Sequence, residues 1–280
     1  MPASGFCPQF PEPACFGYIC GVKEKEYNRI SAWLEKEHDR HNHTGFIESD
    51  PVCIPHIFSA KEDIEIAGFF ASVFAWGQRP MIIKKARLLM EMMDYCPHQF
   101  ILSHSSAELH TFRHFVYRTF NGSDCVYFIR SLRNIYINHG GMETVFSECI
   151  HREDFHAGSA IKRFRDVFFS LPHHKHQEKH ISSPLTGSSC KRINLFLRWM
   201  VRKDAAGVDF GLWEKIKPAM LLCPLDVHSG RTARHIGLLR RKQDDWKAVL
   251  ELTENLKLFS PEDPVKYDFA LFGTGVNNRR

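Results

Sequence analysis

The feature that most constrains this 280-residue sequence is the spacing of its apolar side chains, which recur every three or four residues along most of the chain. Tyr27, Ile30 and Leu34, for example, fall on one face of a helix. Similar stretches follow, and glycine, proline or a polar capping residue bounds many of them. We find no strong run of alternating, β-branched residues bounded by turns. The sequence therefore predicts an all-α fold.

Composition and punctuation suggest how the chain is organised. Hydrophobic residues make up 44% and charged residues 25%, as in an ordinary globular protein. Residues 1–23 are broken by prolines and lack a basic start, so we interpret them as an irregular leader rather than a signal peptide. The most polar interior segment, rich in proline and glycine, is 172–187. We therefore predict an N-terminal helical lobe over 24–171 and a second lobe over 172–280.

Two further observations concern the compartment. Nine cysteines, an odd number at irregular spacing, are typical of reduced thiols inside a cell. No stretch of 18 apolar residues is present, so we expect no membrane span and a cytoplasmic protein. The histidines of the 172–187 segment have no partner motif that would complete a metal site, and we predict no metal there.

The positive charge is concentrated in one part of the sequence. The formal net charge of the chain is +5. Residues 187–247 alone contain thirteen Lys and Arg against six Asp and Glu, a surplus of +7. Such a concentration is expected of a phosphate-binding surface, but it is equally compatible with solvated helix faces.

A first motif opens an apolar helix with the sequence GSSCKRINLFLRWM, residues 187–200. Ser188 or Ser189 is a natural N-cap, and the N–H groups of such a helix start can bind a phosphate. Lys191 would lie in the first turn, where the helix dipole disfavours a cation. Its amine could serve as a nucleophile in imine formation. Spacing alone favours an ordinary surface lysine over this catalytic role.

A second motif, PLDVHSGRTARHIGLL, spans residues 224–239. Asp226 follows an apolar stretch and precedes a basic helix, so its structural role would be that of an N-cap. The same N–H groups would keep its carboxylate ionised and able to stabilise a cation. Arg231 and Arg234 would project from one face of this helix as i and i+3 neighbours.

These two segments resemble the helix-hairpin-helix DNA glycosylase superfamily, which includes endonuclease III and the 8-oxoguanine glycosylases. The hairpin of that superfamily reads leucine, proline, then G-x-G-x-K-T-A, and LTGSSCKRI matches it at Leu185, Gly187 and Lys191. Ser189 replaces the second glycine. The long interval between Lys191 and Asp226 is similar to that of the archaeal 8-oxoguanine glycosylase branch.

The second signature of the superfamily is V-D-T-H-V-x-R-(V/I)-x-x-R-L-G-L, and LDVHSGRTARHIGLL is similar to it at Asp226, His228, Arg231, Gly237 and Leu238. The second arginine of the signature falls on His235 here. A broader resemblance links Tyr27 to Val276 with an uncharacterised bacterial family of conserved proteins, through segments such as GSSCKRINLFLRWMVRKD and PLDVHSGR. This broader resemblance names a family but no reaction.

The glycosylase resemblance implies a two-lobed, helix-hairpin-helix fold that binds duplex DNA and acts on a flipped, modified base. By the same resemblance Lys191 would form a Schiff base with the sugar, and Asp226 would be the catalytic carboxylate. No cysteine follows Cys223, so no iron–sulfur cluster is expected, and no other cofactor is implied. The implied DNA contacts are Gly187, Ser188, Ser189, Lys203, His228, Arg231 and Arg234.

Two other functions remain open at this stage. The chain could be a non-catalytic helix-hairpin-helix protein that binds nucleic acid, which the missing second glycine favours slightly. It could also be a helical scaffold for protein interactions, with the basic segment as a solvated surface. The enzymatic hypothesis requires the side chains of Lys191 and Asp226 to converge. The sequence assigns no oligomeric state.

Overall fold

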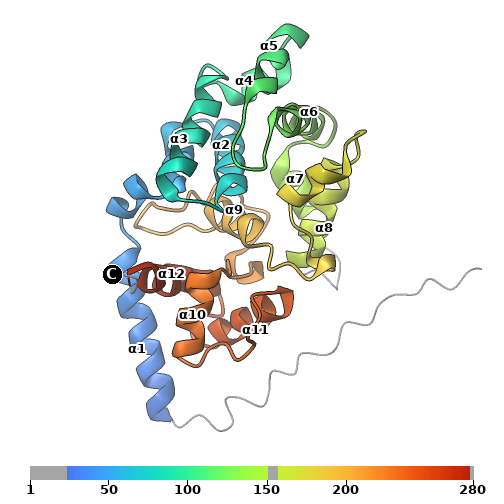
Figure 1. Ribbon diagram of the computed structural model, residues 1–280. Helices are drawn as coiled ribbons and strands as arrows, with labels where there is room; N and C mark the ends of the chain where they lie inside the picture. Colours follow the sequence, from blue (N-terminus) through green and yellow to red (C-terminus); the bar gives the residue numbers. More distant parts are fainter. Residues whose placement is uncertain (1–23, 151–156, 278–280) are drawn as a thin grey trace, which may run out of the picture.

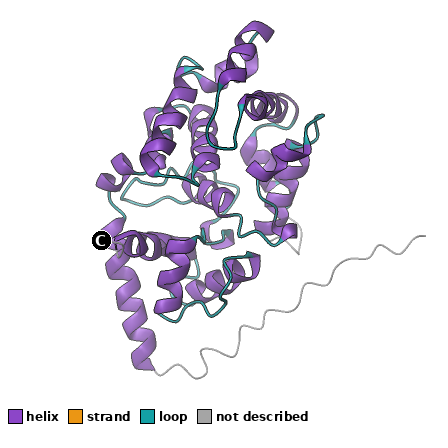
Figure 2. Ribbon diagram, in the orientation of Figure 1, coloured by secondary structure: helices purple, strands orange, loops and turns teal. Residues whose placement is uncertain are grey.

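The computed structural model describes residues 24–150 and 157–277, so the predicted leader over 1–23 lies outside the described residues. Within the described ranges the chain forms helices joined by loops and no strand, which confirms the all-α prediction (Figure 2). The α-helices are α1 (Glu24–His41), α2 (Lys61–Phe74), α3 (Arg79–Glu91), α4 (Pro97–Ser103), α5 (Ser106–Thr111), α6 (Gly122–Asn138), α7 (Met142–Ser147), α8 (Ala157–Phe168), α9 (Lys191–Val201), α10 (Val227–His235), α11 (Trp246–Lys257) and α12 (Asp268–Asn277). Short 3-10 helices connect them: η1 (Thr44–Ser49), η2 (Pro51–Cys53), η3 (Pro55–Ile57), η4 (Phe112–His114), η5 (Lys175–His180), η6 (Pro184–Thr186), η7 (Pro218–Met220) and η8 (Pro264–Tyr267).

The helices form two bodies with α9 between them (Figure 1). The upper body contains α2 to α8, and the lower body contains α1, α10, α11 and α12. Each body has its own cluster of buried apolar side chains. Phe196, Trp199 and Met200 of α9 belong to the upper cluster, which is rich in phenylalanine. Burial of these large side chains is the main term that holds α9 in place.

Packing does not follow the order of the chain. Helix α1 packs along α12, and α10 packs against α12 as well. Two glycines allow these close approaches, because a Cβ at Gly273 would come within 2.3 Å of the His41 ring and one at Gly275 within 2.6 Å of the His228 carbonyl oxygen. Leu34 of α1 accordingly lies in the lower cluster with residues from the C-terminal part of the chain. The predicted lobe boundary at residue 172 stays a prediction.

Several helices begin at capping residues that satisfy their first N–H groups. Asn121 and Asp124 form a reciprocal capping box at α6. Asp226 caps α10, and Asp245 caps α11 by accepting a hydrogen bond from the Ala248 amide. These local signals fix where α6, α10 and α11 start.

The polar segment over 172–187 is anchored to the upper body rather than simply solvated. His180 is buried, and its Nε2 lies 3.1 Å from Asp124 Oδ2. His176 Nε2 lies 3.1 Å from the other oxygen of the same carboxylate. The Gln177 amide donates to the Ser123 carbonyl oxygen. The histidines of this segment therefore help to attach it to the start of α6.

Candidate functional site

The two residues that the motifs single out lie side by side. Lys191 is the first residue of α9, and Asp226 is the N-cap of α10. Lys191 Nζ lies 3.3 Å from Asp226 Oδ2. Their side chains are 23% and 20% exposed, so the pair is partly open to solvent. The two segments come from different parts of the chain, and the fold brings their functional groups together.

Asp226 combines the structural and the electrostatic role that its sequence position suggests. Its Oδ1 accepts hydrogen bonds from the backbone N–H groups of His228 at 2.8 Å and Ser229 at 3.0 Å. Burial acts to raise the pKa of Asp226, but the Lys191 ammonium and these two N–H groups outweigh it, so the pKa lies below its ordinary value. The carboxylate is therefore ionised at neutral pH.

Lys191 also contacts the end of α2. Its Nζ donates to the carbonyl oxygen of Ala75 at 3.4 Å, and the next residue, Arg192, donates to the carbonyl oxygen of Val73 at 2.9 Å. Carbonyl groups at a helix C-terminus carry partial negative charge and favour cations. The start of α9 thus supplies two cations to the C-terminal end of α2, and Lys191 is a half-buried, partnered residue.

Three residues that the motifs did not single out surround the pair. The ring of Phe272 in α12 lies below Lys191 Nζ, with 5.9 Å from the nitrogen to the ring centroid. The Arg79 guanidinium lies 4.9 Å from the same centroid. Asp50 Oδ2 lies 3.8 Å from Arg79 Nε. Neither Arg79 nor Asp50 belongs to a recognisable motif, and both are distant in sequence from Lys191 and Asp226. Only the fold could therefore bring them here.

The start of α9 differs from the prediction. The N-cap is Cys190, in the left-handed region at φ 50°, rather than Ser188 or Ser189, and no side chain caps the helix. Ser188 Oγ instead accepts a hydrogen bond from the Cys190 amide at 3.2 Å. The reason is the left-handed turn, because Gly187 at φ 78° and Cys190 both reverse the chain just before the helix.

The hairpin over 187–190 is docked on the lower body. The carbonyl oxygen of Gly187 accepts from the Trp246 amide at 3.0 Å, and Ser188 pairs with Asp245 in an isolated bridge. Gly187 itself is exposed, and a Cβ at this position would meet nothing within 4 Å. The turn is therefore sterically open near the Lys191 end of α9, and the Gly187 N–H donates to the Pro184 carbonyl oxygen.

The other predicted DNA contacts are dispersed. His228 lies at the pair, its ring makes an edge-to-face contact with that of Phe272, and its Nδ1 lies 3.1 Å from the Gly275 carbonyl oxygen. Lys203 is exposed but lies beyond the opposite end of α9, which is about 16 Å long. Arg231 is exposed further along α10. Arg234 is held within the protein, by Asp244 at 2.5 Å and the Arg241 carbonyl oxygen at 2.7 Å.

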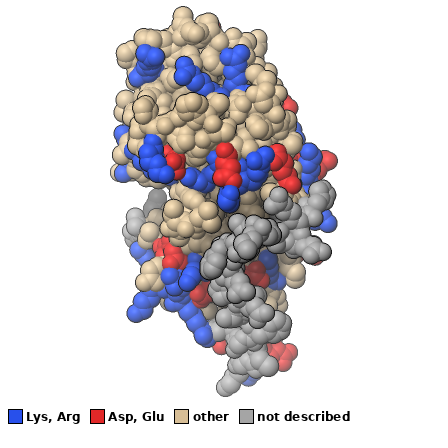
Figure 3. Space-filling model, turned by 90° about the vertical axis from the view of Figure 1, so that its right-hand side faces the viewer, with Lys and Arg blue, Asp and Glu red and all other residues tan. Residues whose placement is uncertain are grey.

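Much of the positive charge of residues 187–247 is neutralised inside the fold. Arg198 and Arg202 are buried and share the buried Asp209. Arg198 also contacts Asp268, while Arg202 also contacts Asp204 and Asp263. On the face drawn in Figure 3, acidic side chains stand among the basic ones across the middle of the molecule. Only part of the positive charge surplus of residues 187–247 therefore lies on the protein surface.

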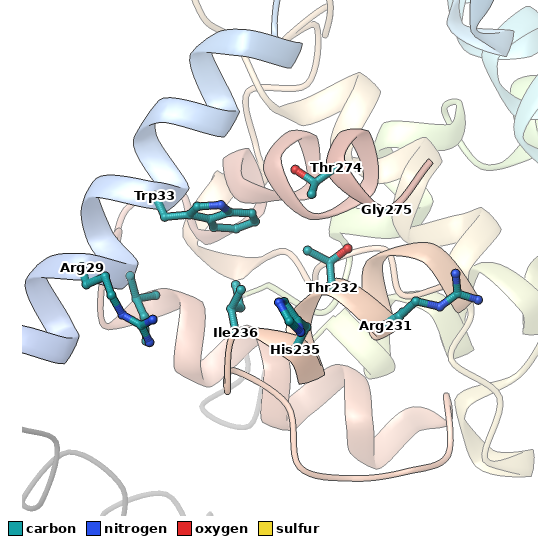
Figure 4. A pocket seen from close by; sticks show the side chains of 9 residues that line it. Arg29, Trp33, Arg231, Thr232, His235, Ile236, Thr274 and Gly275 are labelled. Atoms are coloured by element: carbon teal, nitrogen blue, oxygen red, sulfur yellow. The ribbon is translucent and has the colours of Figure 1, made fainter. Parts of the chain in front are cut away.

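A cavity of about 550 Å³ lies apart from the pair, between α1, α10 and α12. Figure 4 shows Trp33, Thr232, His235 and Ile236 around it, with the Arg231 guanidinium directed away from Trp33. Neither Lys191 nor Asp226 lines this cavity. Across the part of the chain that the structure describes, no group of three or more His, Cys, Asp or Glu could hold a metal ion. No described helix is long and apolar enough to cross a membrane.

Comparison with known proteins places the chain in a family. Its sequence matches the family described as Protein of unknown function (DUF2400) over residues 50–277. The chain belongs to this family. The matched region includes Asp50, Arg79, Lys191, Asp226 and Phe272, whereas α1 lies before it. No curated protein and no solved structure matches the chain.

Proposed function

We propose that this member of the DUF2400 family is a DNA glycosylase with lyase activity, in which Lys191 is the nucleophile and Asp226 the catalytic carboxylate. The observation that carries the proposal is the ion pair between Lys191 Nζ and Asp226 Oδ2, 3.3 Å apart at the starts of two different helices. The two motifs that resemble the helix-hairpin-helix glycosylases supply these same two residues. A two-lobed, glycosylase-like fold is part of the proposal.

In the proposed reaction a modified base is flipped out of the duplex so that C1′ of its sugar faces Lys191. Asp226 accepts a proton from the Lys191 ammonium, which frees the amine for attack. When it gives this proton to the leaving base it regains the negative charge that stabilises the cationic sugar. The amine lone pair forms the Nζ–C1′ bond, and the base leaves with the electron pair of the broken bond. The proton held by Asp226 passes to the departing base, which balances the step.

Strand cleavage follows from the same adduct. The C1′–O4′ bond opens, O4′ takes up a proton, and C1′ and Nζ form an imine. Loss of a proton from C2′ then expels the 3′ phosphate and breaks the strand. Borohydride would donate a hydride to C1′ of the imine and leave the sugar attached to Lys191 by a stable amine.

In this proposal, duplex DNA is bound by the turn at Gly187 and by exposed cations farther from it. Gly187, Ser188 and Ser189 would contact a phosphate through the open turn, and His228 lies beside the reacting pair. Lys203 and Arg231 would contact more distant phosphates. Arg234 could contribute only by giving up its contacts with Asp244 and the Arg241 carbonyl oxygen.

The test is covalent trapping. Duplexes that contain an abasic site or one of a panel of modified bases are incubated with the protein and borohydride, and the cross-linked product is resolved by gel electrophoresis. We expect the wild-type chain to be trapped and Lys191→Gln to lose trapping entirely. Lys247→Gln, which removes an exposed lysine of α11, is the matched control and should be trapped like the wild type.

Three outcomes would contradict the proposal in different ways. Trapping of Lys191→Gln at the wild-type level would show that Lys191 is not the nucleophile. Salt-sensitive binding to duplexes without trapping on any of them would favour a non-catalytic nucleic-acid binder. Failure of the wild-type chain to bind duplex DNA at all would favour a protein-interaction scaffold.

A further inference from the structure

Arg79, from the other body of the protein, contacts the same Phe272 ring as Lys191. It is the first residue of α3 in the upper body, whereas Asp226 and Phe272 belong to α10 and α12 in the lower body. Its guanidinium and the Lys191 ammonium both face the Phe272 ring, 4.9 Å and 5.9 Å from the centroid. The two cations are therefore no farther apart than the sum of those distances.

Within the described part of the chain, the guanidinium of Arg79 has only one weak ion pair. Its Nε lies 3.8 Å from Asp50 Oδ2, which is beyond hydrogen-bond distance, and its side chain is 30% exposed. Among the described residues, no hydrogen bond from its guanidinium is formed. The neighbouring Arg192, by contrast, donates to two backbone carbonyl oxygens. Arg79 thus keeps a planar fork of N–H donors available beside the candidate reaction site.

The neighbours of Arg79 that the structure describes orient its guanidinium but leave some of its N–H donors without an acceptor. Asp50 is itself buried and is held by a hydrogen bond from the Val52 amide at 3.1 Å. It lies on the Nε side of the guanidinium, while the Phe272 ring covers the face. The two Nη groups remain, and a guanidinium edge matches two oxygens of a phosphate in a bidentate contact.

We propose that Arg79 binds a backbone phosphate of duplex DNA next to the nucleotide that Lys191 attacks. The inference rests on the proposed function and adds to it a DNA contact from the upper body. A strand held both by Arg79 and by the turn at Gly187 would cross the Lys191–Asp226 pair. Arg79 is a positioning residue in this arrangement, because it holds the strand and does not touch the reacting atoms.

The experiment measures the salt dependence of duplex binding by fluorescence anisotropy. Each phosphate contact on B-DNA contributes about 0.9 to the slope of log affinity against log salt concentration. Arg79→Ala should lower the magnitude of that slope by about 1 and weaken binding about tenfold at low salt. Arg79→Lys should keep the slope but lose part of the affinity, since it retains the charge without the fork.

Lys84→Ala is the matched control, because it removes one exposed positive charge from the same helix on a different side. It should leave the slope close to that of the wild type. Arg79→Gln, whose amide can still reach Asp50, replaces Arg79→Ala if the alanine variant does not fold. Circular dichroism establishes that each variant is folded.

A slope for Arg79→Ala or Arg79→Gln equal to that of the wild type would overturn the inference, and so would an equal loss in Lys84→Ala. The proposed function fails in a distinguishable way. If the wild-type chain is trapped on DNA and Lys191→Gln is not, the function stands whatever the Arg79 variants do. If the wild-type chain does not bind duplex DNA, the function and the role of Arg79 fail together.

Discussion

The two ends of α9 carry positive charge in different settings. At the N-terminal end, Lys191 has one carboxylate partner, Asp226, at 3.3 Å, and both side chains are partly exposed. Toward the C-terminal end, Arg198 and Arg202 are only 3% and 2% exposed and share the fully buried Asp209. Asp268, Asp204 and Asp263 complete that network.

The two ends of α9 thus differ in whether their cations are buried in a network of ion pairs or are accessible to a ligand. A buried cation must be paired and hydrogen-bonded on several sides, because desolvation of an unpaired charge is very costly. Such a group cannot exchange its partners for a ligand without disrupting the protein. The Lys191 side chain is partly exposed to solvent and, within the described residues, is paired with a single carboxylate, that of Asp226. A substrate can therefore approach it by displacing one ion pair. Arg198 is therefore placed to stabilise the fold, whereas the partly exposed Lys191 is accessible for the reaction that we propose.

The largest effect on stability is expected from Arg198→Met. The methionine would fill a similar volume but leave Asp268 without its arginine, and breaking a buried pair costs about 3–5 kcal/mol. Lys191→Met should reduce the free energy of unfolding by less than about 1 kcal/mol, because its ion pair is partly exposed. Urea denaturation followed by circular dichroism measures both. Equal losses in the two variants would remove the distinction between the ends of α9.

The next effect is the pH dependence of stability, which we expect to have opposite signs for Asp268 and Asp226. Burial raises the pKa of Asp268 to about 6, although Arg198 opposes the shift, so the folded chain binds this proton more tightly than the unfolded chain. The contribution of Asp268 to stability therefore falls as the pH rises from about 4 to about 6. Asp226 has the opposite sign, because its lowered pKa gives stability that is lost only as the pH falls through the folded value.

Asp268→Asn tests this difference. We expect its free energy of unfolding, relative to the wild type, to rise between pH 4 and pH 6 by at most about 3 kcal/mol. Urea denaturation at a series of pH values provides the measurement. A difference that is constant over this range would mean that the pKa of Asp268 is not raised in the folded protein.

The smallest effect comes from dividing the two roles of Asp226. Asp226→Ala removes the cap of α10 and should cost about 1 kcal/mol, whereas Asp226→Ser restores most of that loss because serine is a good N-cap. Both variants lack the carboxylate beside Lys191, so both should lose borohydride trapping. Thermal unfolding and the trapping assay together measure the two roles. If Asp226→Ser were trapped on DNA at the wild-type level, Asp226 would serve only as the N-cap of α10.

Local patterns predicted much of this molecule. The spacing of Tyr27, Ile30 and Leu34 predicted α1, and Asp226 before a basic helix predicted the cap of α10. The prediction failed at the start of α9, where Ser188 or Ser189 was expected as the cap but the left-handed Cys190 precedes the helix. The backbone direction there is set by docking of the hairpin on α11, which no local preference encodes.

The positions of Arg79, Asp50 and Phe272 could not be predicted either. Each comes from an element that is remote in sequence from Lys191, and none forms part of a motif. Likewise, the count of basic residues over 187–247 gave no indication that Arg198 and Arg202 are internal. Two of their four aspartate partners in the described chain, Asp263 and Asp268, lie outside that segment. A count also does not show that Asp204 and Asp209 pair with them. Charge counting along a sequence cannot distinguish a paired interior cation from a surface one.

The sequence by itself determined the helical class, the cap of α10 and the two motifs that contain Lys191 and Asp226, because periodicity and capping depend on residues within one or two turns. Only the tertiary structure decided that Lys191 Nζ and Asp226 Oδ2 lie 3.3 Å apart and that Arg79, from the other body, contacts the same Phe272 ring as Lys191. It also decided which cations are exposed. These properties depend on how α9, α10 and α12 pack, and packing joins residues that the chain holds far apart.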